Sequence, residues 1–296
     1  MSRGIAILLL ALLVQCLITI ALLQQQRAPG DPDRPQSLLE LDIAAVEEIR
    51  ISDHLDNEVL LERMGEQWLL PELDALPAAT GRVAALLDAL NSDGLWPVAD
   101  TPAARQRFQV AEYRFQRRIE FIADDELLGA VYLGTSPGFR KVHARNADHA
   151  AIFSIAFSNH EAPVTSGAWL DNDLLRVRSP LAIIADGYSL RYTGGEWIAG
   201  TGKKPDPREL QALLDALRNL RIEGVAGADE QRELSSAEAD WILTVTGLAG
   251  EATLSLFKHA NRHYIHSSAY PYIFILSAYT YDRLTDTDLS RISGGS

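Results

Sequence analysis

The chain has 296 residues, of which 47% are hydrophobic and 23% are charged, and these fractions are ordinary for domains that bury a core. Its net charge of −13 argues against the binding of nucleic-acid phosphates, which needs clustered Lys and Arg, so we expect no nucleic-acid partner. The single cysteine, Cys16, excludes an intrachain disulfide and a cysteine metal site in the rest of the chain. The length predicts two domains.

The first predicted element is an apolar run over residues 4–23. A helix of about 20 residues rises far enough, at ~1.5 Å per residue, to cross a ~30 Å hydrocarbon core. A cleaved signal peptide is one alternative, but the run is long for one and no small-x-small site follows it. Lipoprotein processing at Cys16 is another, although bulky Gln15 precedes the cysteine and the apolar run continues past it. The sequence therefore favours an uncleaved membrane anchor over residues 1–27.

The charges around this run predict its orientation. Arg3 lies before the run, whereas Arg27 after it is followed closely by Asp31 and Asp33. The positive-inside rule then favours an N-terminus in the cytoplasm and the remaining chain outside, which is the periplasm in a bacterium. We expect a single-pass protein of the bacterial inner membrane, bound to the membrane through its N-terminal helix. The three prolines of residues 28–37 predict an extended linker.

Residues 38–160 are predicted to form the first of two repeats. Alternating residues predict a hairpin of strands 48–52 and 59–63, and then a third strand that contains Trp68. Thr80 is the expected cap of a helix whose apolar face carries Val83, Leu86, Leu87 and Leu90. Four more strands are expected at residues 117–122, 127–133, 141–144 and 152–155.

Residues 161–285 are predicted to form the second repeat, followed by a tail over residues 286–296. Asp186-Gly187 predicts a hairpin turn, and the strand after it carries Trp197. Asp206 is the expected cap and Pro207 the first-turn residue of the next helix. The remaining strands are expected at residues 241–246, 253–257, 262–266 and 272–276.

The two predicted helices share the pentapeptide Leu-Leu-Asp-Ala-Leu, at residues 86–90 and 213–217. We therefore predict an α+β protein. An N-terminal transmembrane helix precedes two tandem homologous repeats, each a mainly antiparallel sheet with one principal helix.

The unit of a tryptophan, a loop and this helix resembles the DUF4340 family, and so do residues 133–134, 141–145, 152–155 and 169–175. The resemblance covers roughly residues 38–285. It implies an accessory envelope role beside ABC-type export or gliding-type transport components, and it supplies no catalytic residues. The second repeat departs from the pattern because Phe257 stands where the first has Gly134. A site that depends on this glycine is therefore expected only in the first repeat.

The histidines His259, His263 and His266 form the one cluster that suggests a metal site. A predicted turn at Ala260-Asn261 places His263 and His266 on opposite faces of one strand, and no carboxylate lies inside the cluster, so we expect no metal.

Residues 200–204 resemble a phosphate-binding loop but lack its first glycine and its final Ser or Thr, so a solvated turn is expected. Paired carboxylates and a nucleophile elbow are not found, and we therefore expect no catalytic residues and no cofactor.

Tyrosines are frequent near the C-terminus, where they pack in a core or form a partner surface. The candidates for a partner surface are Tyr264, Tyr270, Tyr272, Tyr279 and Tyr281. The sequence favours a non-enzymatic binding or scaffolding module that contacts ABC-type transporter subunits or other envelope proteins. The alternative is an envelope-associated hydrolase whose active site is assembled from distant residues.

Overall fold

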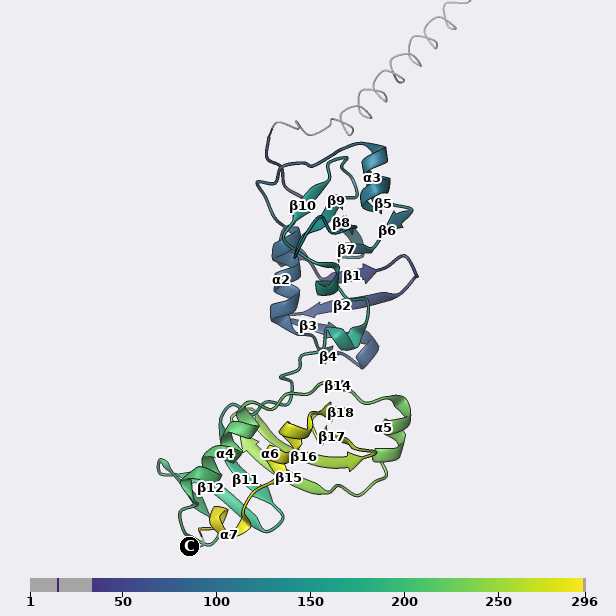
Figure 1. The fold of residues 1–296 in the computed structure, drawn as a ribbon. Coiled ribbons are helices and arrows are strands. Elements are labelled where there is room, and N and C mark those ends of the chain that lie inside the picture. The colour runs from purple at the N-terminus through teal and green to yellow at the C-terminus, as the bar shows by residue number, and fades with distance from the viewer. Residues whose placement is uncertain (1–14, 16–33, 295–296) are drawn as a thin grey trace, which may run out of the picture. The chain divides into compact units, whose positions relative to one another are not determined.

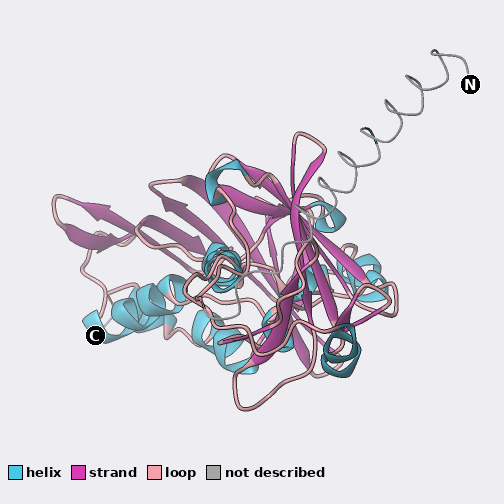
Figure 2. Cartoon of the chain, turned by 90° about the horizontal axis from the view of Figure 1, so that it is seen from above, coloured by secondary structure: helices cyan, strands magenta, loops and turns pink. Residues whose placement is uncertain are grey.

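The computed structural model describes residue 15 and residues 34–294, which form two compact units that divide between Trp169 and Leu170 (Figure 1). The domain boundary expected from the sequence lies nine residues earlier, after residue 160. The predicted anchor and most of the predicted linker lie outside the described residues. Within the described residues, no helix is long and apolar enough to cross a membrane. Strand residues outnumber helical residues in both units, and helices flank the strands (Figure 2), as expected for an α+β protein.

The first unit is built on an eight-stranded antiparallel sheet with the order β10-β9-β8-β7-β1-β2-β3-β4. Its strands are β1 (Glu48–Ser52), β2 (Glu58–Met64), β3 (Gln67–Leu70), β4 (Leu76–Pro77), β7 (Arg117–Ala123), β8 (Glu126–Leu133), β9 (Val142–Asn146) and β10 (Phe153–Ile155). Alternation places Ile49 of β1 and Phe121 of β7 opposite each other, and both are fully buried. The period-two pattern in the sequence therefore marks the core-facing side of this sheet.

The principal helix of the first unit is α2 (Thr80–Leu90), which buries Val83, Leu86, Leu87 and Leu90 as the pattern predicts. The prediction that Thr80 caps this helix is wrong, because Ala79 occupies the cap position without a side-chain bond. The Ala79 backbone N–H donates a 2.7 Å hydrogen bond to the Trp169 carbonyl. This bond holds Ala79 in an extended conformation, so Thr80 becomes the first helical residue.

A smaller layer covers part of the other face of this sheet. It consists of α3 (Pro102–Phe108) and the two-stranded pair β5 (Val110–Ala111) and β6 (Arg114–Phe115). Val110, Tyr132 and Ile152 form its buried centre, and Phe108 and Phe115 pack against them. The sequence analysis did not predict these elements. The short 3-10 helices of the unit are η1 (Ile43–Ala45), η2 (Pro71–Leu73), η3 (Asn159–Glu161) and η4 (Ser166–Ala168).

The second unit has an eight-stranded antiparallel sheet with the order β13-β12-β11-β15-β16-β17-β18-β14. Its strands are β11 (Pro180–Ala185), β12 (Tyr188–Thr193), β13 (Glu196–Ala199), β14 (Gly224–Val225), β15 (Trp241–Gly247), β16 (Gly250–His259), β17 (Arg262–Ser267) and β18 (Ile273–Leu276). The succession from β18 to β13 is the same as that from β10 to β3 in the first unit. Corresponding positions of the two sheets can therefore be matched by strand register.

The helices of the second unit are α4 (Pro207–Arg218), α5 (Ala228–Leu234), α6 (Ala278–Thr285) and α7 (Leu289–Ile292). Asp206 caps α4 as predicted, because its carboxylate accepts the backbone N–H groups of Arg208 and Glu209 at 2.9 and 3.2 Å. Helix α6 packs against α4 and β17, whereas α5 belongs to the opposite side of the sheet, where Leu234 packs against Phe257. The helices α5, α6 and α7 were not predicted.

Candidate binding site in the second unit

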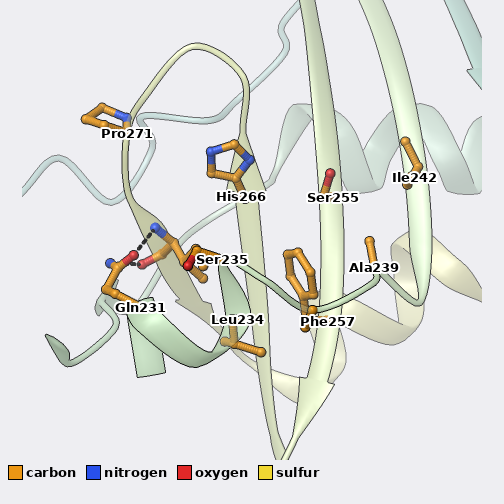
Figure 3. Close-up of a pocket in the computed structure, with 11 residues that line it drawn as sticks. Gln231, Leu234, Ser235, Ala239, Ile242, Ser255, Phe257, His266 and Pro271 are labelled. Carbon is orange, nitrogen blue, oxygen red and sulfur yellow. Dashed lines mark hydrogen bonds between the residues drawn. The ribbon is translucent and has the colours of Figure 1, made fainter. Parts of the chain in front are cut away.

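The clearest candidate site is a pocket of about 390 Å³ between α5 and the sheet of the second unit, named here the α5 pocket (Figure 3). This volume lies in the range of ~300–1,000 Å³ that is typical of small-ligand sites. Its apolar lining includes Leu234, Phe257 and Ile273, and its polar lining includes Ser255 and His266. Apolar walls combined with a few convergent polar groups are common in binding sites.

The register of β16 and β17 brings the polar lining together. Ser255 pairs with His266 across the two strands, and Phe257 pairs with Tyr264 two residues further along. Because side chains alternate along a strand, these four lie on one face of the sheet, and buried Leu256 points to the other. Figure 3 shows Ser255 and His266 on neighbouring strands above the α5 segment.

A tight turn sets this register. Ala260 and Asn261 both have positive φ, at 47° and 62°, as the type I′ turn of a two-residue hairpin requires. The predicted hairpin turn at Ala260-Asn261 is therefore confirmed. Asparagine is favoured in this conformation, whereas alanine is not.

Two side chains attach α5 to the sheet. Glu230 accepts a 2.6 Å hydrogen bond from the Tyr264 hydroxyl and forms an ion pair with Arg262. The Gln231 amide donates to the Ile273 carbonyl and accepts the Ile273 backbone N–H, both at 2.9 Å, as the dashed lines in Figure 3 show. The amide therefore satisfies both backbone groups of Ile273 and fixes one wall of the α5 pocket.

Electrostatics reinforce the contact between α5 and β17. The hydrogen bond from Tyr264 holds the pKa of the Glu230 carboxyl below its usual value, with help from the Gly227 backbone N–H. Burial raises the pKa of the Tyr264 hydroxyl, and the hydrogen bond to Glu230 raises it further. At neutral pH, therefore, Glu230 is ionised and Tyr264 is protonated, the states that this hydrogen bond needs.

In the first unit an aromatic ring occupies the corresponding place on the sheet. Leu133 pairs with Arg117 across the first sheet as Leu256 pairs with Trp241 across the second. Matching these pairs makes Tyr132 the counterpart of Ser255. The Tyr132 ring is buried in the centre of the small layer under α3.

The neighbours of this ring also have smaller counterparts in the second unit. The Tyr132 ring lies 5.4 Å from the Phe115 ring and 5.0 Å from the Arg145 guanidinium carbon. The same matching places Ala239 at the position of Phe115 and His266 at the position of Arg145. Three large side chains are thus replaced by three smaller ones, and the space between them lies open.

The open sheet face beside the pocket also differs between the units. In the first unit, Arg50 lies 3.9 Å from Glu120, which also pairs with Arg118. In the second, the counterparts of Arg50 and Arg118 are Ile184 and Ile242, which are 51% and 48% exposed. Ile242 also lines the α5 pocket, so this half-exposed apolar side chain connects the pocket with the open sheet face.

The five tyrosines proposed as a partner surface do not lie together. Tyr264 is fully buried under α5, and Tyr281 is buried with its ring 4.6 Å from that of His263. Core packing therefore explains these two. Tyr270 and Tyr272 are half-buried, and Tyr279 on α6 is 74% exposed. Tyr270 lines a separate pocket of about 630 Å³ with residues that include Leu174, Val177 and Leu254.

The histidine cluster is divided by the sheet. His263 contacts α6 on one face and His266 lines the α5 pocket on the other, as alternation along β17 requires. His259 lies 3.4 Å from Glu233. Among the residues that the structure describes, no group of three His, Cys, Asp or Glu is placed to hold a metal ion. Residues 200–204 form a turn after β13, where Lys204 forms an ion pair with Glu196.

The α5 pocket offers groups for binding. Ser255 and His266 are the residue types of a nucleophile and its base, but the described part of the chain shows no hydrogen bond between them. The pocket lining contains no carboxylate that would orient the imidazole. Sequence analysis missed this site because its signal, the loss of large side chains at matched positions, appears only when strand register is known.

Comparisons with curated proteins and with solved structures found no match. The family described as Domain of unknown function (DUF4340) matches residues 68–240, which is more than half of the chain. The matched segment begins at Trp68 in β3 and ends just before β15, so it takes in parts of both units. The chain therefore belongs to the DUF4340 family.

Proposed function

We propose that this protein is a membrane-anchored binding module of the bacterial envelope and not an enzyme. Its N-terminal apolar run spans the inner membrane, and two homologous α+β repeats lie in the periplasm, where they serve an ABC-type transport system or another envelope assembly. The shared strand succession of the two sheets and the pentapeptide repeated in α2 and α4 support the duplication.

One observation carries the proposal of a binding role. The second sheet presents an open face on which Ile184 and Ile242 are about half exposed beside the α5 pocket. The corresponding residues of the first sheet are arginines held in ion pairs with Glu120. Exposed apolar side chains next to a pocket are typical of partner surfaces. The second repeat therefore contacts the partner, and the first supports it.

Photo-crosslinking in intact membranes tests this proposal. A photoreactive phenylalanine replaces Ile242 in the full-length protein, and a matched variant carries it at Arg118, the corresponding position of the first sheet. We expect the Ile242 variant to capture a transporter permease or another integral envelope protein, identified by mass spectrometry. We expect the Arg118 variant to capture that protein far less. The proposal would be contradicted if both variants captured the partner equally. It would also be contradicted if the Ile242 variant captured no more of it than a control protein that lacks the two units.

A further inference from the structure

We propose that the α5 pocket binds an aromatic side chain, specifically a tyrosine ring, that a partner polypeptide supplies. The inference deepens the proposed function, since it names the chemistry by which the second unit holds its partner. It rests on the pocket and on its filled counterpart in the first unit.

The first unit shows what this place in the fold accommodates. There, Tyr132 projects from β8 and its ring packs between the Phe115 ring at 5.4 Å and the Arg145 guanidinium carbon at 5.0 Å. The ring is only 5% exposed. In the second unit, Ser255 takes the position of Tyr132 and brings no ring. The same architecture is thus complete in one sheet and lacks its central aromatic group in the other.

The size and lining of the α5 pocket suit the missing ring. Its volume of about 390 Å³ exceeds the ~150 Å³ cavity that is enough for one benzene molecule. Phe257 and Ile273, both buried, supply apolar walls, and Leu234 of α5 closes one side. Aromatic rings prefer tilted or offset contact with one another, and Phe257 offers such a partner. A ring inserted here buries its faces as Tyr132 does.

Two polar groups suit the hydroxyl of a tyrosine. The Ser255 hydroxyl and the His266 imidazole both line the pocket, and no hydrogen bond of either side chain is found among the described residues. Buried or half-buried polar groups gain stability when a ligand group pairs with them. A phenol both donates and accepts a hydrogen bond, so it satisfies either tautomer of the imidazole. The pocket therefore favours tyrosine over phenylalanine.

The chain's own residues outside the described ones cannot supply this ring, because residues 1–14, 16–33 and 295–296 contain no Phe, Tyr or Trp. The half-exposed Ile242, which lines the pocket, and the half-exposed Ile184 on the same sheet face point to a polypeptide source, since together they offer an apolar surface that reaches beyond the pocket. A partner that covers these isoleucines is placed to insert a tyrosine beside them.

Ligand-observed saturation-transfer NMR tests the inference on the full-length protein in lipid nanodiscs, with empty nanodiscs as the blank. The probe is N-acetyltyrosinamide, and the comparison ligands are N-acetylphenylalaninamide and 4-methylphenol. We expect saturable binding of the tyrosine probe with a dissociation constant on the order of 1 mM, a typical affinity for so small a ligand, and weaker binding of the phenylalanine compound.

Variants that refill the pocket decide the site. Ser255→Tyr restores the ring found in the first unit, and we expect it to weaken probe binding at least tenfold. Ala239→Phe restores the ring that Phe115 supplies in the first unit, and it replaces Ser255→Tyr in this test if Ser255→Tyr does not fold. Thr246→Tyr adds the same side chain to the same sheet face outside the pocket and should leave binding unchanged.

Absence of binding to the wild type, or undiminished binding to folded Ser255→Tyr, would overturn the inference. If the wild type bound 4-methylphenol but did not bind N-acetyltyrosinamide, the assignment to a polypeptide would be overturned. These measurements need no partner, so their outcome does not depend on the crosslinking in membranes. If the Ile242 variant captured a partner but the wild type did not bind the tyrosine probe, the proposed function would be supported and the further inference would be wrong.

Discussion

The hydroxyl of Tyr264 donates a 2.6 Å hydrogen bond to Oε1 of Glu230, which joins the middle of β17 to the first turn of α5. The two residues are 34 positions apart in the chain. Glu230 also accepts the backbone N–H of Gly227 at 2.9 Å, so one carboxylate both caps α5 and holds it on the sheet. The wall of the α5 pocket depends on this contact.

Replacing Tyr264 with phenylalanine should loosen α5 while the sheet stays folded. Loss of a hydrogen bond to a charged group costs about 1.5–3 kcal/mol. That cost corresponds to amide hydrogen exchange in α5 that is roughly 10–150 times faster. Hydrogen–deuterium exchange mass spectrometry of the full-length protein measures this. Tyr279→Phe is the matched control, because Tyr279 is 74% exposed, and its α5 exchange should equal that of the wild type.

Gly134 should tolerate no side chain. A Cβ at this position would lie 2.0 Å from the Phe108 carbonyl oxygen, where the end of α3 meets β8. Gly134→Ala must displace backbone, so we expect it to lower the free energy of unfolding by about 1–3 kcal/mol or more. Urea unfolding followed by tryptophan fluorescence measures this change. Gly138→Ala is the control, since its added Cβ would meet no atom within 4 Å. Equal midpoints for the two variants would refute this account of the glycine.

The stability of the first unit should fall as the pH drops below 6.5. His143 is 7% exposed and stacks on Phe108 with ring centroids 4.0 Å apart. Burial lowers the pKa of this imidazole from 6.5, against the hydrogen bond from Nδ1 to the Thr135 carbonyl. Between pH 6.5 and the lower pKa of the folded state, His143 is therefore protonated in the unfolded chain but largely neutral in the folded chain. The stabilisation is complete above pH 6.5 and is lost as the pH falls through the folded pKa.

Melting temperatures of the first unit at pH 7.5 and 5.5 test this effect. His143→Gln should reduce the difference between the two values, because it removes the titrating group. His54→Gln, at an exposed position, should keep the difference of the wild type. An unchanged difference in His143→Gln would assign the pH dependence to other groups.

Deleting residues 1–27 should release a folded protein from the membrane. The deleted segment contains the whole apolar run of residues 4–23, and the strands and helices of both units lie after it, within residues 34–294. Membrane fractionation should therefore move the protein from the pellet to the supernatant, and its circular dichroism should keep the signal of a β-rich fold. Deletion of residues 28–33 alone is the control and should leave it in the pellet. Persistent membrane association of the first fragment would point to a second attachment.

Local patterns in the sequence determined the elements whose conformation depends on near neighbours. The apolar spacing of Val83 to Leu90, the Asp206 cap and the turn at Ala260-Asn261 each act within a few residues, so they were predictable from the chain alone. The motif at Trp68 and Trp197 likewise identified the family. The cap at Thr80 failed because a distant carbonyl, that of Trp169, holds the preceding residue.

Tertiary structure alone decided the site. Ser255 lines a pocket and Tyr132 fills one because strand pairing and the small layer over each sheet set their surroundings. Phe257 replaces Gly134 for the same reason, since the end of α3 approaches the first sheet as backbone, whereas α5 approaches the second through Leu234. Such differences arise from contacts between residues far apart in sequence, and no local pattern of side chains records which face of a strand another element will cover.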